Sequence, residues 1–458
     1  MSYTGLSLKP LILSHNNSKP IKMSQKQTQN YLFPLIIVFI VCFLIGFITT
    51  MNNSMIELCS KAFKLTAQQG QYVNTAFYGA YILAIPFSLL MSKIGYKGTL
   101  ILGLAVAGIG FIINSLGING VLDQDVSTIY AVFLGSMCVV AMGVVMLQNV
   151  ANPYVMVLGS PEKGAFRMTL SQALNSVATT VAPLFITYMI FTNKDAEGNV
   201  IATGADIPGP FLGLGIFTLI ICGILVFLKL PKIDEGKQSE EAGEKIVEKS
   251  SVFKYPHVWL GALGIFMYMG VEIGVPSMLP YKFKVLGLDG ATTFLTFYWG
   301  GMMVGRFIGA GILTKFEPRV LLSSCITLGA ICIGASLVLP GMISVWCMLA
   351  AGLFHSVMWP LVFNLGLQKL GRHTKAASGI INTGVIGAAI LMPIMGAVVD
   401  NISLSTGGTI VTDPDTLKEV VTPTSTGVTI AISLMFVYYV YLLWFCWKGS
   451  KIGLNEKK

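Results

Sequence analysis

Long apolar stretches without charge alternate with short polar gaps along the chain. One of them reads ISVWCMLAAGLFHSVMWPLVFNLGL. A helix rises about 1.5 Å per residue and the hydrocarbon core of a membrane is about 30 Å thick, so roughly 20 such residues cross it. The pattern therefore predicts twelve membrane-spanning helices, at residues 31–52, 70–92, 98–117, 128–153, 169–192, 209–230, 257–280, 292–314, 320–338, 343–368, 377–399 and 427–447.

The two halves of the chain resemble each other. Residues 75–104 and 295–324 share a Phe-Tyr pair, a glycine-rich apolar helix, a lysine and a turn, and 152–164 echoes 359–371. Parallel halves with a substrate between them are a known transporter architecture. We therefore expect an all-α membrane protein of two six-helix pseudo-repeats, divided into a tail (1–30), a first bundle (31–230), a linker (231–256), a second bundle (257–447) and a tail (448–458).

Composition supports a lipid environment. Hydrophobic residues make up 54% of the chain and charged residues 11%, against about 25% charged in soluble domains. The net charge of +9 comes from Lys and Arg in the gaps between spans, which indicates membrane orientation and not nucleic-acid binding. Most of them fall on the side of both termini, so we expect both termini to be cytoplasmic, with translation starting at Met1 or Met23.

The fourth span ends in an unusual polar cluster, LQNVANPYVMVLG. A side-chain amide in hydrocarbon costs several kcal/mol without a partner, so Gln148, Asn149 and Asn152 should face protein or a water-filled cavity. Gln148 and Asn152 share one helix face. Pro153 frees a backbone carbonyl in the preceding turn and can bend the span there. Amides offer a donor and an acceptor to each hydroxyl, which suits a neutral polyol.

The fifth span carries a polar stripe that includes Gln172, Asn175 and Ser176 at helical spacing. Aromatic faces and amide edges match the C–H faces and hydroxyl rims of a sugar ring. The alternative is that each polar residue only joins neighbouring helices. Further candidate sugar contacts are Asn74, Tyr78, Tyr268, Tyr298, Trp299, Trp359, Asn364 and Asn382.

Glu272, Arg306 and His355 lie well inside predicted spans. Glu272 can bind and release a coupling proton there, or it can make a structural contact between helices. Arg306 is costly in hydrocarbon unless it is paired, and we expect a structural or gating role. His355 is either a ligand or a packed core histidine.

Enzyme signatures are missing from the sequence. There is no P-loop, HExxH or GxSxG motif, and the linker is too short for a nucleotide-binding domain. The eight cysteines are scattered without a CxxC pair, so we expect no metal or cofactor. Transport must then be driven by a gradient, with H⁺ or Na⁺ as the candidate coupling ions.

Several motifs resemble the fucose–galactose–glucose–proton symporter family of the major facilitator superfamily. They are LQNVANPYVMVLG, MTLSQALNS, FYGAYILAIPFSLLMSKIGYKG, YMGVEIGVPS, FYWGGMMVGRFIG and LGRHTKAASGI. The resemblance implies uptake of a monosaccharide through a bacterial inner membrane by alternating access. It places Gln172 and Asn175 on sugar-binding positions, with Gln148 and Asn152 lining the same cavity, and Glu272 on an acid of the glucose/galactose members.

Two departures from this family bear on the coupling ion. Asn53, also a candidate sugar contact, stands where proton-coupled relatives carry an acid, and Gln148 stands where the fucose branch carries a glutamate. Neither amide titrates, so Glu272 could take over, sodium could be the coupling ion, or the protein could be a uniporter. A carrier of a non-sugar solute and a non-transporting sensor remain alternatives. We expect a functional monomer.

Overall fold

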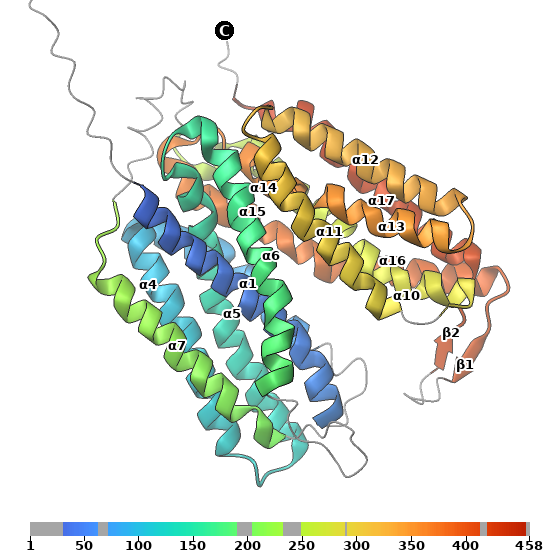
Figure 1. Cartoon of the computed structure of the whole chain (residues 1–458), viewed down its shortest axis with the longest axis horizontal. Helices are drawn as coiled ribbons and strands as arrows, with labels where there is room; N and C mark the ends of the chain where they lie inside the picture. The colour runs from blue at the N-terminus through green and yellow to red at the C-terminus, as the bar shows by residue number, and fades with distance from the viewer. Residues whose placement is uncertain are drawn as a thin grey trace, which may run out of the picture.

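The computed structural model describes residues 31–62, 72–189, 204–231, 249–288, 291–412 and 419–454. The N-terminal tail, most of the central linker, the last residues of the C-terminal tail and the side chains of Asn53 and Asn74 lie outside the described part. Helices dominate what is described, arranged as two bundles (Figure 1).

The first bundle begins with α1, whose apolar run carries the chain through one crossing. Gly95 has a φ of 75°, a left-handed conformation that favours glycine, and it turns the chain between the second and third spans within α4. The helices of this bundle are α1 (Leu32–Ala62), α3 (Tyr72–Gly79), α4 (Ala84–Asn119), α5 (Val126–Val157), α6 (Gly164–Met189) and α7 (Pro208–Phe227).

The second bundle contains three spans that are broken near their middle. The seventh span breaks at Ile273, the tenth between His355 and Met358, and the eleventh at a 3₁₀ turn over Thr383–Ile386. Its helices are α9 (Pro256–Glu272), α10 (Gly274–Leu286), α11 (Ala291–Ile312), α12 (Pro318–Val338), α13 (Gly341–His355), α14 (Met358–Gly366), α15 (Thr374–Asn382), α16 (Gly387–Ser405) and α17 (Ser425–Trp447).

A small hairpin lies in the last loop, for which no strand was predicted. β1 (Ile410–Thr412) pairs antiparallel with β2 (Glu419–Val421), with Ile410 opposite Val421.

The twelve predicted spans are confirmed. Nine helical segments of the described chain are long and apolar enough to cross a membrane, and one of them, Thr75–Asn119, contains two spans joined at Gly95. The two spans outside this set are α6, which carries the polar stripe, and α11, which carries Arg306. The least apolar spans are therefore the ones with polar residues at their centres.

Prolines explain how side chains meet the helix backbone at mid-span. Proline has no N–H, so the carbonyl four residues before it loses its partner within the helix. Pro153, Pro276 and Pro360 free the carbonyls of three residues in this way, and each carbonyl accepts a hydrogen bond from a side chain. The pairs are Asn149 with Ser378 Oγ (2.9 Å), Glu272 with the Tyr298 hydroxyl (2.8 Å) and Ser356 with Arg306 Nε (3.3 Å).

The bend expected at Pro153 does not break the helix, unlike the breaks in the second bundle. Helix α5 continues through Pro153 to Val157, whereas the chain breaks next to Glu272 and at Ser356. The freed carbonyl, and not a break in the helix, is the consequence of Pro153.

The two bundles lie side by side, with α1–α7 in blue to green and α9–α17 in yellow to red (Figure 1). We call the end where α1 begins and α17 ends the terminal end, and the end that carries β1 and β2 the hairpin end. The ribbons of the two bundles diverge toward the hairpin end (Figure 1). Contacts between the bundles join α6 with α11 and α15 with α4 and α5.

Small residues let α4 and α5 approach closely. A Cβ atom at Gly143 would lie 2.5 Å from the backbone nitrogen of Ala107 and 2.6 Å from the carbonyl oxygen of Gly103. Such backbone proximity is typical of helix packing in membranes.

We predict that Gly143→Ala destabilises the first bundle by about 1–3 kcal/mol, because the added methyl group forces α4 and α5 apart. The measurement is the thermal unfolding of the purified protein in detergent. Gly135→Ala in the same helix is the matched control, because a Cβ there meets nothing within 4 Å. Equal melting temperatures for the two variants would contradict the prediction.

Candidate functional site

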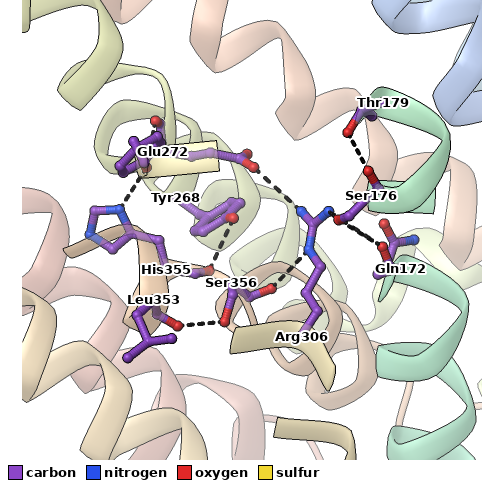
Figure 2. Close-up of polar contacts among 10 residues, drawn as sticks. Gln172, Ser176, Thr179, Tyr268, Glu272, Arg306, Leu353, His355 and Ser356 are labelled. Atoms are coloured by element: carbon purple, nitrogen blue, oxygen red, sulfur yellow. Dashed lines mark hydrogen bonds and ion pairs between the residues drawn. The ribbon is translucent and has the colours of Figure 1, made fainter. Parts of the chain in front are cut away.

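A buried ion pair lies at the centre of the molecule. Arg306 of α11 faces Glu272 of α9, with 3.7 Å between Nη2 and Oε1, and each side chain is 11% exposed. The guanidinium also donates from Nη1 to the Gln172 carbonyl (3.4 Å) and to the Ser176 hydroxyl, both on α6. Figure 2 shows that Arg306 lies between the second bundle and α6 of the first. One side chain therefore links the two bundles at mid-span.

A network of tyrosines around His355 supports this pair. The Glu272 carbonyl only accepts, so the Tyr298 hydroxyl donates to it, and His355 Nδ1 must donate to the Tyr298 oxygen at 2.8 Å. His355 Nε2 then accepts from the Tyr439 hydroxyl at 2.5 Å. Tyr268 donates to the His355 carbonyl at 3.1 Å. His355 is fully buried with both ring nitrogens bonded, as expected of a packed core histidine.

Tyr268 and Tyr298 were predicted as sugar contacts, but in this conformation they belong to the network around His355. Both side chains are fully buried and both hydroxyls bond to helix carbonyls. Their hydroxyls hold the broken helices around Glu272 in place and are not open to a ligand here.

Some of the polar residues predicted on α5 and the helix next to it have partly exposed side chains. The Gln148 side-chain oxygen accepts a hydrogen bond from the Tyr81 hydroxyl. The ring of Tyr78 stacks on that of Tyr81, with 6.2 Å between their centroids. Gln148 and Tyr78 are partly exposed, whereas Tyr81 is buried. An amide and an aromatic face that a polyol can use thus come from two helices.

The stripe on α6 lies next to α5 and α1. Gln172 Nε2 donates to Asn152 Oδ1 at a long 3.4 Å, and Asn175 Nδ2 donates to the Cys42 carbonyl at 3.0 Å. Gln172 and Asn175 are partly exposed. Asn152 is buried, and its Nδ2 has no hydrogen-bond partner among the described residues. We call Gln148, Asn152, Gln172 and Asn175 the amide cluster.

Three other predicted contacts have neighbours of their own. Trp299 is 42% exposed, with its ring edge-to-face against Tyr298. Trp359 is mostly buried and stacks on Phe363 at 5.1 Å. Asn364 lies toward the other bundle, its Nδ2 4.0 Å from where a Cβ of Gly164 would be.

A second polar group joins the bundles nearer the terminal end. Asn149 donates from Nδ2 to the Ala84 carbonyl of its own bundle at 2.7 Å, and its Oδ1 accepts from Asn382 Nδ2 of the other bundle at 2.7 Å. Its main-chain carbonyl accepts from Ser378 Oγ at 2.9 Å. Asn149, Ser378 and Asn382 are all fully buried, and we call them the clasp.

The contact between Asn382 and the opposite bundle was not predicted from the sequence. Predicted as a sugar contact, Asn382 in this conformation is bonded to Asn149 between the bundles. Ser88 of α4 adds a parallel contact, donating to the Ala376 carbonyl at 3.1 Å. The terminal end is therefore held shut. Asn149 and Ser378 were missed as a pair, although a proline four residues after Asn149 indicated a carbonyl in need of a partner.

Comparisons with known proteins agree with this architecture. The profile of the Major Facilitator Superfamily matches residues 38–393. A glucose/galactose transporter of Brucella abortus (strain 9-941) is 35% identical over 393 residues, which cover 84% of this chain and 92% of the relative. An L-fucose-proton symporter of Escherichia coli (strain K12) is 27% identical over 82% of this chain and 88% of the relative.

Solved structures show the same fold. The crystal structure of the transporter FucP in the outward conformation covers 90% of this chain and 99% of its own, with a TM-score of 0.70 and 23% identity. The proton:xylose symporter XylE superimposes with a TM-score of 0.67 at 14% identity.

We predict that Asn149→Ala opens the terminal end in a larger fraction of molecules. The variant removes the bond that Asn382 donates to the Asn149 side chain across the bundles, which contributes about 0.5–1.5 kcal/mol to closure, and this loss shifts the population several-fold. Electron–electron resonance distances between spin labels at Lys93 and Lys369, both exposed, measure the change in a cysteine-free background.

The matched control for this prediction is Asn114→Ala. Asn114 is equally buried, but it bonds to Ser136 within the first bundle, at 2.7 Å. The distance distribution of Asn114→Ala should match that of the unsubstituted protein. An unchanged distribution in Asn149→Ala would contradict the claim that the clasp holds the terminal end closed.

Proposed function

Because the chain belongs to the Major Facilitator Superfamily, we propose that it is a secondary active transporter that carries a monosaccharide across a membrane by alternating access. It is a multi-pass membrane protein and not an enzyme. Its relatives are named for glucose, galactose and L-fucose, and hexoses of this kind are the substrates we propose.

The observation that carries this proposal is the amide cluster. Three of its four members are partly exposed at mid-span, beside the α6–α11 contact between the bundles. Several amides within one bundle match a neutral ligand with many hydroxyl groups, since each amide both donates and accepts. The long Gln172–Asn152 bond leaves hydrogen-bonding capacity on the partly exposed Gln172 that sugar hydroxyls can use. Asn152 is buried beneath it, and its Nδ2, without a partner among the described residues, reaches a sugar only when α5 and α6 shift.

We assign direct sugar contacts to the amide cluster and Tyr78, and a positioning role to Tyr268 and Tyr298. Arg306 has a structural and gating role, and Glu272 binds the coupling ion. Further contacts in other conformations of the cycle remain predictions for Asn53, Asn74, Trp299, Trp359, Asn364 and Asn382.

Alternating access follows from the arrangement of the bundles. Residues 31–230 and 257–447 act as two units that rock about the amide cluster. The conformation described is closed by the clasp at the terminal end, so in this conformation a sugar reaches the amide cluster from the hairpin end. We propose that the protein lies in a bacterial inner membrane as a monomer, with the terminal end cytoplasmic, so that transport is import.

We predict that Gln172→Ala weakens sugar binding about tenfold. A hydroxyl of the bound sugar then loses a hydrogen-bond partner worth about 1.4 kcal/mol. Isothermal calorimetry with D-glucose, D-galactose and L-fucose measures the affinity. Gln124→Ala, on an exposed loop, is the control and should bind normally. An unchanged affinity in Gln172→Ala would return α6 to a purely structural role.

We predict that Glu272→Gln abolishes accumulation of sugar against a gradient and leaves exchange of sugar partly intact, because the amide cannot carry the coupling ion. Uptake of radiolabelled sugar into proteoliposomes under an imposed proton gradient, a sodium gradient or none measures both activities. Glu317→Gln, an exposed carboxylate before α12, is the control. Normal accumulation in Glu272→Gln would remove Glu272 from the coupling role.

A further inference from the structure

The contacts of Arg306 extend to both candidate sites. Its Nη2 lies 3.7 Å from the Glu272 carboxylate, and its Nη1 donates to the main chain of Gln172 and to the Ser176 hydroxyl on the polar stripe of α6. We propose that Arg306 is the residue through which proton binding at Glu272 and sugar binding at the amide cluster strengthen each other. This inference rests on the proposed function.

The first step of the reasoning concerns charge. A guanidinium keeps its proton in proteins. When the Glu272 carboxylate takes up a proton, Arg306 loses its counter-charge while its side chain stays almost buried. A buried charge without a partner is strongly unfavourable. Among the described residues, Arg306 then keeps neutral acceptors, including the carbonyls of Ser356 and Gln172 and the hydroxyl of Ser176.

The second step concerns what a sugar adds. A sugar bound along α6 brings hydroxyl oxygens to the place where Gln172 and Ser176 now accept from Arg306. These oxygens are additional acceptors for a guanidinium that has lost its carboxylate. Sugar binding is therefore more favourable when Glu272 is protonated, and by reciprocity a bound sugar favours protonation of Glu272. This linkage is what a symporter requires.

The same geometry favours H⁺ over Na⁺. A sodium ion on the Glu272 carboxylate would lie within a few ångströms of the Arg306 guanidinium, and like charges repel strongly in a medium of low dielectric constant. A proton neutralises the carboxylate without adding a charge next to Arg306. The coupling ion that fits this site is therefore a proton.

The surroundings leave Glu272 as the group that exchanges the proton. Titratable and charged groups that face it are Arg306 and Tyr298 of α11, Tyr268 of α9, His355 of α13 and, beyond the histidine, Tyr439 of α17. The tyrosine hydroxyls and both ring nitrogens of His355 are already satisfied as neutral groups, so an added proton at His355 would break this network.

The test measures sugar affinity from about pH 5 to about pH 8, by calorimetry with D-glucose, D-galactose and L-fucose on the full chain in nanodiscs. We expect the unsubstituted protein to bind about 5- to 150-fold more tightly at low pH. Glu272→Gln should hold the tight affinity at every pH. Arg306→Gln should bind more weakly and without pH dependence. Retention of the normal pH dependence in Arg306→Gln overturns the proposal.

Ser176→Ala tests the same claim with both charges kept, should Arg306→Gln fail to fold. The variant removes an acceptor with which the sugar competes for Arg306. We expect it to bind sugar several-fold more tightly at high pH than the unsubstituted protein, with a smaller pH dependence. A merely structural role for Ser176 gives weaker or unchanged binding at high pH, which would contradict the proposal.

The outcomes separate the coupling mechanism from the function. Sugar binding that is independent of pH in the unsubstituted protein overturns the role of Arg306 and leaves sugar transport standing. Failure of all three sugars to bind at any pH contradicts the proposed function, and the coupling inference with it.

Discussion

A polar group in hydrocarbon must find its partner within the protein, and the centre of this molecule is arranged around three carbonyls that cannot find one in their own helices. Pro153, Pro276 and Pro360 create them. Two of these carbonyls accept from Tyr298 and Arg306, which fixes α11 between the broken helices of the second bundle. The third, on α5, is bonded from the other bundle and so depends on the conformation of the whole protein.

The carbonyls freed by proline have different partners in the two halves. Pro153 and Pro360 occupy matching places in the repeated segments 152–164 and 359–371. In the first half the freed carbonyl meets Ser378 of the opposite bundle, whereas in the second half it meets Arg306 of its own bundle. One copy therefore belongs to the closure between bundles, and the other holds the charged centre.

The amide cluster and the ion pair are likewise divided between the bundles. The first bundle supplies amides, which suit a ligand that carries no charge, and the second supplies the Glu272–Arg306 pair. Arg306 crosses from one to the other through Gln172 and Ser176. A neutral sugar and an ion can thus influence one another without sharing a binding site, because one guanidinium needs acceptors from both sides.

The sequence by itself determined the spans, the two halves and the positions of the polar residues, because membrane thickness sets helix length and hydrocarbon excludes unpaired polar groups. It also indicated a carbonyl freed by Pro153. Only the tertiary structure decided the partners, since Asn149 and Asn382 are 233 residues apart and local spacing carries no information on contacts across a bundle. Burial of Tyr298 and exposure of Gln172 likewise depend on how the bundles are packed and tilted, which no periodicity along the chain encodes.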